Sequence, residues 1–351
     1  MKPLRIWLVG TGTVGTWLAG ALGSQRERLA TSYGLDAMVV GAASARGGFV
    51  YDANGFDLAS LPTAARGSRP AAGGRGVGRW PATIEGLRAT EADLLVEVSA
   101  SPAADGEPGV THMREALQRR IPVVTSNKWP VALRGTELAA LARSQGVAFR
   151  AESTVMSGTP VLSTLTEGLA GALPLALRGL LNATANFILS RMAGGRSYED
   201  ALAEAQRAGL AERDPAADVE GDDTVAKVMI LSGLVFGRQL RRDQVTCRGI
   251  TAVTGREIAE AAAAGGRIKH VSTLGFAGPG GAGSVTARVR PEFTGRDDPL
   301  VNVDGTTNAV VFEADPVGRV TITGPGAGPQ LAGLGVLSDI IAVASRRAEG
   351  A

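Results

Sequence analysis

The sequence of 351 residues predicts an α/β protein, and its length is sufficient for two domains. Short apolar runs alternate with helical stretches in the first half of the chain, which is the pattern of a parallel sheet covered by helices. The first run, Leu4–Val9, leads directly into the pattern GxGxxG, formed by Gly10, Gly12 and Gly15, and a helical stretch follows at 16–22. A strand, a glycine-rich turn and a helix in this order indicate a dinucleotide-binding unit.

Each glycine of this turn has a separate physical role. Gly10 permits the tight turn, Gly12 lets the backbone approach a pyrophosphate, and Gly15 lets the helix pack closely on the strand. The helix N-terminus then faces the phosphates. The alternative is a glycine-rich turn without a ligand. We expect the whole turn to bind the cofactor, through Gly10, Thr11, Gly12, Thr13, Val14 and Gly15.

The second predicted strand, at 37–42, bears on the choice of nucleotide. A site that prefers NAD usually carries Asp or Glu near the end of this strand, to hold the ribose 2′-hydroxyl. Here the strand is followed by Ala43 and Ser44, with Arg46 just beyond. These residues favour a 2′-phosphate, hence NADP, although Arg46 as a solvated side chain is the alternative. Further strands are predicted at 92–98 and 122–125, and beyond their ends Ser99 and Lys128 are expected to complete the cofactor site.

Lysine usage points to a second feature. Lys and Arg total 36, but lysine occurs only at Lys2, Lys128, Lys227 and Lys269. Arginine does not give up its proton, whereas lysine can, so these few lysines are candidates for proton transfer. Lys227 ends the acidic run 212–227, and Asp223 lies four residues before it, so the two side chains can pair on one helix face. The alternative is an exposed helical ion pair worth about 0.3–0.5 kcal/mol.

Composition excludes several classes of protein. The net charge is +2 and no basic block is present, so neither nucleic acid nor an anionic membrane is an expected partner. No apolar stretch is long enough to span a bilayer, and no signal peptide is evident, so we expect a cytoplasmic protein. The single cysteine, Cys247, excludes an intrachain disulfide framework and is expected to be buried. His112 and His270 fit no catalytic or metal pattern and are expected to be structural. Residues 68–80 are expected to form a surface loop.

Six segments, which together extend over almost the whole chain, resemble the homoserine dehydrogenase family. The most specific is 209–227, in which the run from Glu212 to Lys227 reads Glu-x-Asp-Pro-x-x-Asp-Val-x-Gly-x-Asp-x-x-x-Lys. The other five are 10–15, 106–108 with 123–128, 152–160, 179–192, and 324–328 followed by a helix.

The resemblance implies an NAD(P)-dependent oxidoreductase that interconverts aspartate 4-semialdehyde and homoserine, in threonine and methionine biosynthesis. It implies a Rossmann-like nucleotide-binding domain at 1–150, completed by the C-terminal helix at about 324–348. An α/β substrate-binding and dimerisation domain is then expected at 151–323, in a homodimer. Many relatives carry an ACT-type regulatory domain, for which this chain leaves no room, so we expect the short form of the family.

The resemblance also assigns roles to residues. Lys227 is the first candidate for the proton donor and Lys128 the second, with Asp223 holding the ammonium of Lys227 in place. Family positions that bind the amino-acid substrate correspond to Glu212, Asp218, Ala183 and Thr184. The segment 152–160 corresponds to a loop that can bind a monovalent cation such as Na⁺ through backbone carbonyls, with Val155 and Ser157 as the expected carriers and Glu152 nearby.

Three departures from the family pattern surround the expected substrate pocket. Ala183 stands where glycine is usual, Met156 and Ser157 stand at further glycine positions, and Leu210 replaces an aromatic residue. Changes of this size alter discrimination by about 1–3 kcal/mol. One reading is drift within an ordinary homoserine dehydrogenase, and another is a pocket for a different small amino or hydroxy acid. A non-catalytic NADP-binding protein is a third, against which the intact lysines and carboxylates argue.

Overall fold

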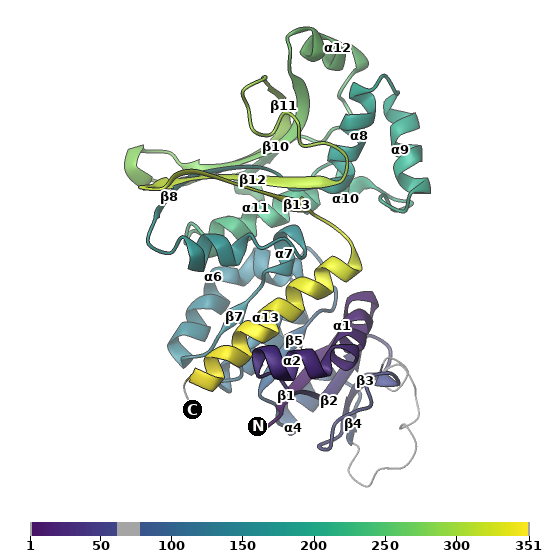
Figure 1. The fold of residues 1–351 in the computed structure, drawn as a ribbon, viewed down its shortest axis with the longest axis vertical. Coiled ribbons are helices and arrows are strands. Elements are labelled where there is room, and N and C mark those ends of the chain that lie inside the picture. The colour runs from purple at the N-terminus through teal and green to yellow at the C-terminus, as the bar shows by residue number, and fades with distance from the viewer. Residues whose placement is uncertain (1, 62–77, 350–351) are drawn as a thin grey trace. The chain divides into compact units, whose positions relative to one another are not determined.

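The computed structural model describes residues 2–61 and 78–349, which form two compact units (Figure 1). Unit 1 comprises Met1–Gly158 together with Gly328–Ala351, and unit 2 comprises Thr159–Ala327. The chain therefore leaves unit 1 once and returns to it at its C-terminal end. The return was expected from the helix predicted after Gly328.

Unit 1 contains a seven-stranded sheet in the order β4-β3-β2-β1-β5-β6-β7. The five strands β2, β1, β5, β6 and β7 are parallel, while β3 and β4 add to one edge in antiparallel fashion. Since β2 and β5 lie on opposite sides of β1, the strand order reverses there, and in such sheets ligands bind outside the carboxyl ends of the strands at this point. The strands are β1 Leu4–Val9, β2 Ala37–Ser44, β3 Gly48–Tyr51, β4 Gly78–Trp80, β5 Leu94–Glu97, β6 Val123–Thr125 and β7 Phe149–Arg150.

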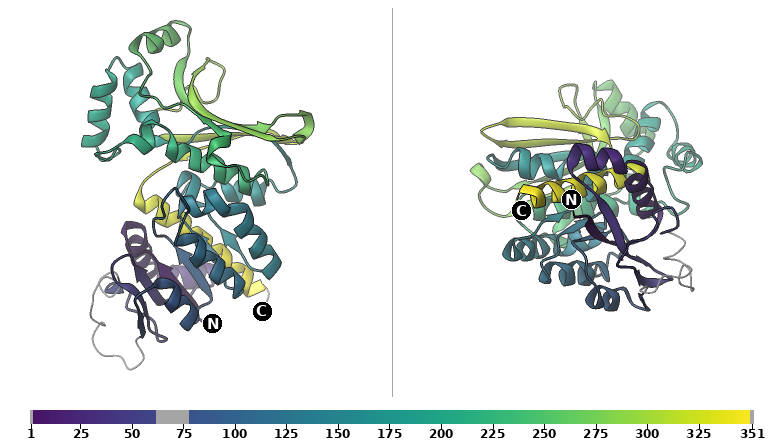
Figure 2. Two further views of the ribbon diagram at one scale, coloured as in Figure 1. Left: turned by 180° about the vertical axis from the view of Figure 1, so that it is seen from behind. Right: turned by 60° about the horizontal axis from the view of Figure 1, so that its bottom comes forward.

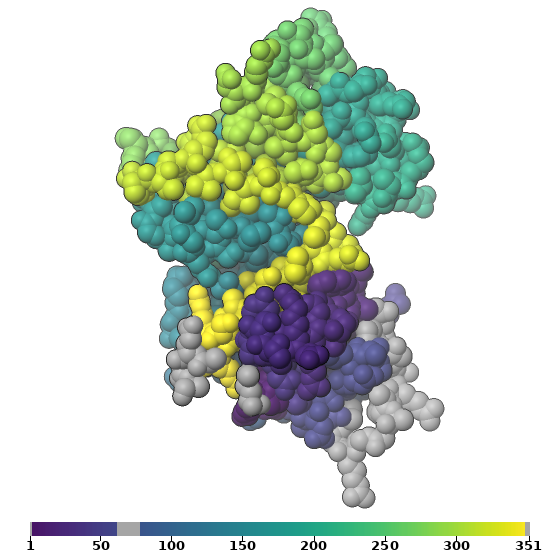
Figure 3. All heavy atoms as spheres, viewed as in Figure 1, coloured from purple at the N-terminus to yellow at the C-terminus, as the bar shows by residue number. Residues whose placement is uncertain are grey.

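Helices cover both faces of this sheet (Figure 2). One apolar cluster joins β1, β2 and β5 to α1, α2 and the C-terminal helix α13, and a second joins the other face to α4, α5 and α6. Figure 3 shows the yellow C-terminal helix against the purple N-terminal helices. The helices are α1 Thr13–Ser24, α2 Arg26–Tyr33, α4 Thr83–Ala89, α5 Gly109–Gln118, α6 Lys128–Gln145 and α13 Pro329–Glu349.

Unit 1 extends beyond the boundary predicted at residue 150. The segment after β7 forms a short helix, α7 Ser153–Met156, rather than the predicted loop. Asp339 of α13 pairs with Arg150 at 2.7 Å and accepts a hydrogen bond from the backbone N–H of Glu152 at 2.9 Å. The hydroxyl of Ser153 donates to the carbonyl of Ala332 at 2.8 Å. Because of these contacts with α13, unit 1 extends to Gly158 rather than to residue 150. The chain returns to unit 1 at Gly328, which is also later than the predicted 324.

Unit 2 contains a six-stranded sheet in the order β13-β12-β8-β10-β11-β9, in which only the pair β11 and β9 is parallel. Side chains of β11 alternate: Val285, Ala287 and Val289 are buried, whereas the intervening residues are exposed. Along β11, one face is thus apolar and packed and the other is exposed and polar. The strands are β8 Leu173–Leu180, β9 Val245–Cys247, β10 Arg267–Phe276, β11 Val285–Thr294, β12 Thr307–Asp315 and β13 Gly318–Pro325.

Helices α8 and α11 contact this sheet directly. Helix α8 packs on β10 and β12, and α11 packs on β9, β10 and β11. Every residue of α11 from Thr224 to Gly233 is buried. The helices of the unit are α8 Ala183–Ala193, α9 Tyr198–Arg207, α10 Ala216–Val219, α11 Asp222–Leu234 and α12 Gly255–Ala263.

The predicted elements of the first half agree closely with those observed. The strand at Leu4–Val9 has the predicted bounds, and the second strand extends two residues beyond the predicted 37–42. The strands predicted at 92–98 and 122–125 are observed at Leu94–Glu97 and Val123–Thr125. Of the predicted loop at 68–80, residues 78–80 form β4, and the rest lies outside the described residues. No helix within the described residues is both long and apolar enough to cross a membrane.

Candidate functional site

The glycine-rich turn of unit 1 has no room for side chains at two of its three glycines. Gly10 has φ +108°, and a Cβ there would lie 2.6 Å from the backbone nitrogen of Ser99. A Cβ on Gly15 would lie 2.0 Å from the carbonyl oxygen of Gly10. The two glycines let β1, β5 and α1 approach one another, as the sequence pattern predicted.

Gly12 differs from the other two glycines of the turn, Gly10 and Gly15. It precedes α1, has extended backbone with φ −75°, and makes no side-chain capping contact. A Cβ on Gly12 would meet no described atom within 4 Å. The position is therefore open, at a helix N-terminus whose first N–H groups have no partner within the helix. This arrangement fits a phosphate group, which these N–H groups and the helix dipole would bind.

Ser99 is held beside this turn by a buried carboxylate that sequence reasoning missed. Glu97, at the end of β5, is fully buried and accepts hydrogen bonds from both the backbone N–H and the hydroxyl of Ser99. Its other oxygen lies 2.8 Å from Nδ1 of His112, which is also buried. His112 is thus structural, as predicted. An acidic residue inside the apolar run 94–97 was the available signal, because a buried carboxylate requires partners.

Arg46 and Lys128 both lie beyond carboxyl ends of parallel strands in unit 1. Arg46 is exposed in the turn between β2 and β3, where the hydroxyl of Ser44 accepts from the backbone N–H of Gly47 at 2.9 Å. Lys128 is partly buried and is the first residue of α6, directly after β6. The preceding Asn127 is fixed by a hydrogen bond to the hydroxyl of Ser101 at 2.8 Å.

Unit 2 carries the lysine predicted to transfer a proton. Asp223 and Lys227 lie one turn apart on α11, and the ammonium is 2.9 Å from the carboxylate of Asp223. The same ammonium donates to the backbone carbonyl of Leu181 at 2.6 Å. Only 7% of Lys227 is exposed, so the alternative of a solvated ion pair on a helix surface is wrong.

Asn182 connects this pair to a second carboxylate and is the residue that sequence reasoning missed in unit 2. Its side-chain oxygen accepts from the backbone N–H of Ala185 at 2.8 Å, which caps α8. The cap fixes the direction of the amide, so its nitrogen faces the two aspartates. It donates to Asp218 at 2.7 Å and to Asp223 at 3.2 Å. Asn182, Asp218, Asp223 and Lys227 together are called the lysine cluster below.

The other predicted substrate residues differ in burial and in how they are connected to the lysine cluster. Ala183 and Thr184 are buried in the first turn of α8, and the Thr184 hydroxyl donates to the carbonyl of Leu210 at 2.9 Å. Leu210, one of the departures, therefore enters the site through its backbone. Glu212 is exposed, and its carbonyl accepts from the side chain of Gln206 at 3.1 Å. The structure brings Asp218 into the cluster through Asn182.

The segment predicted to hold a cation is buried in unit 1. Glu152, Val155 and Met156 are buried, and Ser157 has φ +53°, an unusual backbone conformation for a residue with a side chain. The carbonyl oxygen of Ser157 faces Gly335 of α13, where a Cβ would be 2.4 Å away. Among the described residues, no group of three or more His, Cys, Asp or Glu side chains could hold a metal ion.

His270 and Cys247 are neighbours of the α11 N-terminus. Nε2 of His270 lies 3.1 Å from the carbonyl of Arg248, and burial lowers the pKa of His270 to about 4, so the ring is neutral. Cys247 is only partly buried, less than predicted, and burial raises the pKa of its thiol. Both surround Gly221, the residue before α11. Neither side chain contacts the lysine cluster through a described hydrogen bond.

Comparison with known proteins supports the family that the sequence resembles. The family model described as homoserine dehydrogenase matches residues 160–341. A protein named NAD(+)-dependent homoserine dehydrogenase from Pseudomonas canavaninivorans is 38% identical over 343 residues, which cover 97% of this chain and 96% of that protein. A homoserine dehydrogenase from Methanocaldococcus jannaschii is 34% identical over 96% of this chain and 98% of its own length.

Solved structures of the same description share the fold. A putative homoserine dehydrogenase from Archaeoglobus fulgidus superposes with a TM-score of 0.84 at 30% identity, covering 97% of this chain and 99% of that one. A hyperthermophilic archaeal homoserine dehydrogenase in complex with NADPH gives a TM-score of 0.80 at 28% identity, covering 98% of each chain.

Proposed function

The chain belongs to the homoserine dehydrogenase family, and we propose that Lys227 is the proton donor of its reaction. The protein is an NAD(P)-dependent oxidoreductase that interconverts aspartate 4-semialdehyde and L-homoserine. The observation that carries the proposal is the burial of Lys227 against Asp223, with Asn182 holding the carboxylate.

The chemistry requires such a group. The reduced nicotinamide supplies a hydride to the aldehyde carbon, and the carbonyl oxygen gains negative charge in the transition state. An ammonium beside that oxygen stabilises the charge and then gives it a proton, a contribution of about 10²–10⁴-fold. Asp223 holds the ammonium of Lys227 in place, and the Leu181 carbonyl limits the directions in which it can point. We assign Lys128 a second, supporting role with nucleotide and substrate.

The substrate carries its own ammonium group, which needs carboxylates and carbonyls around it. We propose that Asp218 and Glu212 supply these charges, with Thr184 and Ala183 lining the pocket. Support differs between the two acids, since Asp218 is tied to the lysine cluster by Asn182, whereas Glu212 is exposed. Ala183 and Leu210 are then the positions at which this pocket differs in shape from that of the family.

The nucleotide site is proposed at the glycine-rich turn of unit 1. Gly10 and Gly15 shape the turn, Gly12 leaves the pyrophosphate position open, and Thr11, Thr13 and Val14 supply backbone around it. Ser99, fixed by Glu97, is proposed to contact the cofactor beyond β5. We propose NADPH rather than NADH because β2 ends in Ala43 and Ser44 without a carboxylate, next to exposed Arg46.

A homodimer, a cytoplasmic location and a monovalent cation at Glu152, Val155 and Ser157 are further parts of the proposal. The dimer and the cation follow from the resemblance to the family. For the cation, the carbonyl oxygen of Ser157, which lies close to Gly335 of α13, would have to be one of the ligands. Light scattering of the purified protein tests the dimer, and turnover in NaCl against choline chloride tests the cation.

The decisive experiment compares wild type with Lys227→Met. Wild-type protein should oxidise NADPH in the presence of aspartate 4-semialdehyde, and the variant should lose at least about 100-fold in kcat because it has no acid. NADPH binding, measured by fluorescence titration, should stay unchanged. Lys2→Met, which removes an exposed lysine outside both the glycine-rich turn and the lysine cluster, is the matched control.

Two results would contradict the proposal. A variant that retains wild-type kcat would exclude Lys227 as the donor. Wild-type protein that binds NADPH without turnover would point to Met156, Ala183 and Leu210, and other small aldehydes and hydroxy acids would then be tested as substrates.

A further inference from the structure

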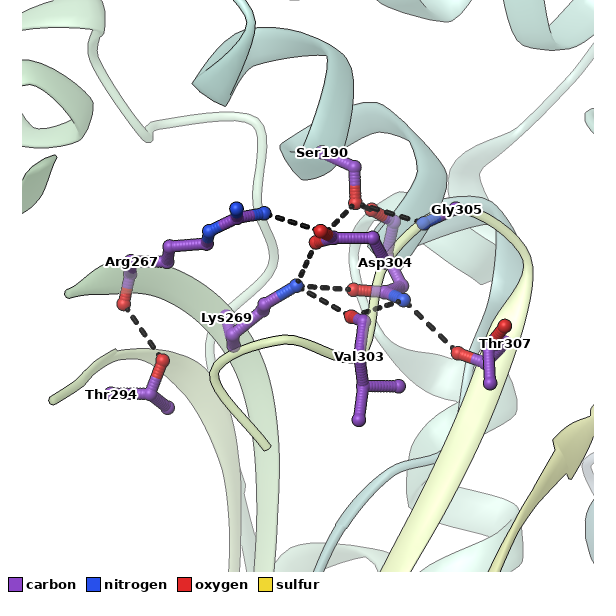
Figure 4. A network of polar contacts seen from close by, with 9 residues as sticks. Ser190, Arg267, Lys269, Thr294, Val303, Asp304, Gly305 and Thr307 are labelled. Atoms are coloured by element: carbon purple, nitrogen blue, oxygen red, sulfur yellow. Dashed lines mark hydrogen bonds and ion pairs between the residues drawn. The ribbon is translucent and has the colours of Figure 1, made fainter. Parts of the chain in front are cut away.

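Lys269 is a buried lysine that the reaction does not use. It lies on β10, and 2% of its side chain is exposed. Its ammonium donates to three acceptors: the carbonyl of Val303 at 2.6 Å, Asp304 at 2.8 Å and the side-chain oxygen of Asn186 at 3.3 Å (Figure 4). Burial lowers the pKa of Lys269, and its hydrogen bond with Asp304 opposes that effect. A chain with so few lysines keeps one in the interior of unit 2.

Asn186, the partner of Lys269 on α8, belongs to a stripe of polar residues along that helix. Asn182, Asn186 and Ser190 are spaced four residues apart, so they share a face of the helix. The hydroxyl of Ser190 accepts from the backbone N–H of Gly305 at 3.1 Å and lies 3.4 Å from Asp304. The first residue of the stripe is the cap of the helix and a member of the lysine cluster. The other two bind the loop before β12.

Lys269 fixes the direction of the Asn186 amide. The amide nitrogen donates to the carbonyls of Val303 and Thr307, both at 3.0 Å, while the oxygen faces the ammonium. Figure 4 shows the Lys269 ammonium close to the carboxylate of Asp304 and the carbonyl of Val303. All polar atoms of Asn186 are therefore committed. Any rotation of α8 about its axis would break several of these bonds at once.

The angular position of α8 matters at its other end. An atom on the helix surface lies about 5–6 Å from the axis, so a rotation of about 20° moves it by about 2 Å. Such a shift exceeds what hydrogen bonds of 2.7 Å and 3.2 Å, from Asn182 to Asp218 and Asp223, can tolerate. The lysine cluster thus depends on how α8 is held.

We propose that Lys269 is a positioning residue for the reaction. Through Asn186 it holds α8 at the rotation that brings Asn182 against Asp218 and Asp223, and so keeps Lys227 in place. The inference rests on the proposed role of Lys227. A buried ion pair is often replaceable by apolar residues without loss of stability, which favours a role in specifying geometry.

The test is a double-mutant cycle on kcat, with Lys269→Met and Asn182→Ser. Serine keeps the cap of α8 but removes both amide donors. We expect Lys269→Met to lower kcat about tenfold with unchanged NADPH binding and unchanged circular dichroism. The double variant should be no slower than Asn182→Ser alone, because Lys269 acts through Asn182. Arg267→Met is the matched control, since Arg267 contacts the same Asp304 from a side chain that is 37% exposed. It should leave kcat unchanged.

Asp304→Asn keeps the test decisive if Lys269→Met does not fold. The Asp304 side chain is 42% exposed, so the variant should fold, and weaker attraction for Lys269 should lower kcat by a smaller factor with the same non-additivity. The inference would be overturned by an unchanged kcat, or by effects on kcat that add to those of Asn182→Ser. If wild type turns over in the same experiment, the proposed function remains intact. Wild type without turnover would overturn both.

Discussion

The glycine-rich turn of unit 1 and the lysine cluster of unit 2 are built from different parts of the chain. The turn consists of backbone: Gly10 and Gly15 leave no room for side chains, and Gly12 leaves an open position at a helix N-terminus. The cluster consists of side chains from three segments, in which Asn182, Asp218, Asp223 and Lys227 hold one another by hydrogen bonds.

The difference has a consequence for how each region responds to change. The glycine-rich turn depends on the absence of Cβ atoms, so a substitution that adds side-chain atoms there should impair nucleotide binding. A network of buried charges depends on exact partners, because a charge left unpaired in the interior is costly. Substitutions in unit 1 should therefore alter nucleotide binding, and substitutions in unit 2 should alter kcat or the pH dependence of stability.

The largest expected effect concerns His270 in unit 2. The pKa of its ring falls from 6.5 to about 4 on burial, so the folded state resists protonation. The neutral ring of His270 makes its full contribution to the free energy of unfolding above pH 6.5. This contribution is lost as the pH falls toward 4, by about 3 kcal/mol in all. His270→Gln should remove this loss, as measured by urea unfolding at pH 8 and pH 5.

Comparing wild type with the His270 variant also removes from the result the contribution of Asp339, which changes the free energy of unfolding in the opposite direction with pH. Asp339 in unit 1 has its pKa raised to about 6 by burial, so its contribution to stability is present at low pH and lost as the pH rises through 6. Both proteins carry Asp339. A difference between them that does not change with pH would show that His270 titrates normally.

The next effect concerns the amide of Asn182. Asn182→Asp preserves the cap of α8 but places a third carboxylate against Asp218 and Asp223. We expect kcat at pH 7 to fall about 100-fold, a change of about 2.7 kcal/mol, because repulsion moves Asp223 away from Lys227. Kinetics from pH 6 to 10 measure it. Asn182→Ser, which adds no charge, should lose less, and equal loss in the two variants would exclude repulsion as the cause.

A smaller effect is expected at Gly12 in unit 1. Gly12→Ala adds a methyl group that meets no described atom, so the fold should be unaffected. The methyl group would occupy the position proposed for the pyrophosphate, and NADPH should bind at least about tenfold more weakly, or about 1.4 kcal/mol. Gly20→Ala, on α1 and equally open, is the control for binding titrations. If the two variants bind alike, the turn does not hold the pyrophosphate.

The smallest expected effect is at Arg46. Its side chain is exposed, and a solvated ion pair with a 2′-phosphate is worth up to about 1 kcal/mol. Arg46→Ala should lower the ratio of kcat/KM for NADPH over NADH by up to about fivefold. The exposed Arg256 of unit 2, replaced by alanine, should leave that ratio unchanged. An unchanged ratio in the Arg46 variant would assign the preference elsewhere.

Sequence patterns predicted unit 1 well because the patterns are local. The apolar run Leu4–Val9 and the glycines after it define a strand, a turn and a helix within a few residues, and the structure has them at those positions. The scarcity of lysine singled out Lys227, and the spacing to Asp223 predicted their ion pair, which is confirmed.

Other parts of the site depend on residues far apart in the chain. Glu97 became a partner of His112 only through the packing of α5 on β5. Part of the loop predicted at 152–160 became a short buried helix, Ser153–Met156, beside α13, which lies nearly two hundred residues later and binds Arg150, Glu152 and Ser153. Local propensity carries no signal for such contacts.

The sequence by itself determined the α/β class, the nucleotide-binding turn, the family and the identity of the proton-transfer candidates, since residue types and short spacings encode these. Tertiary structure decided that Lys227 is buried, that Asn182 joins two aspartates to it, and that Lys269 is buried against Asn186 and Asp304. The physical reason is that burial and hydrogen-bond direction arise from packing between distant segments, and a buried polar group has a defined role only once its partners are in place.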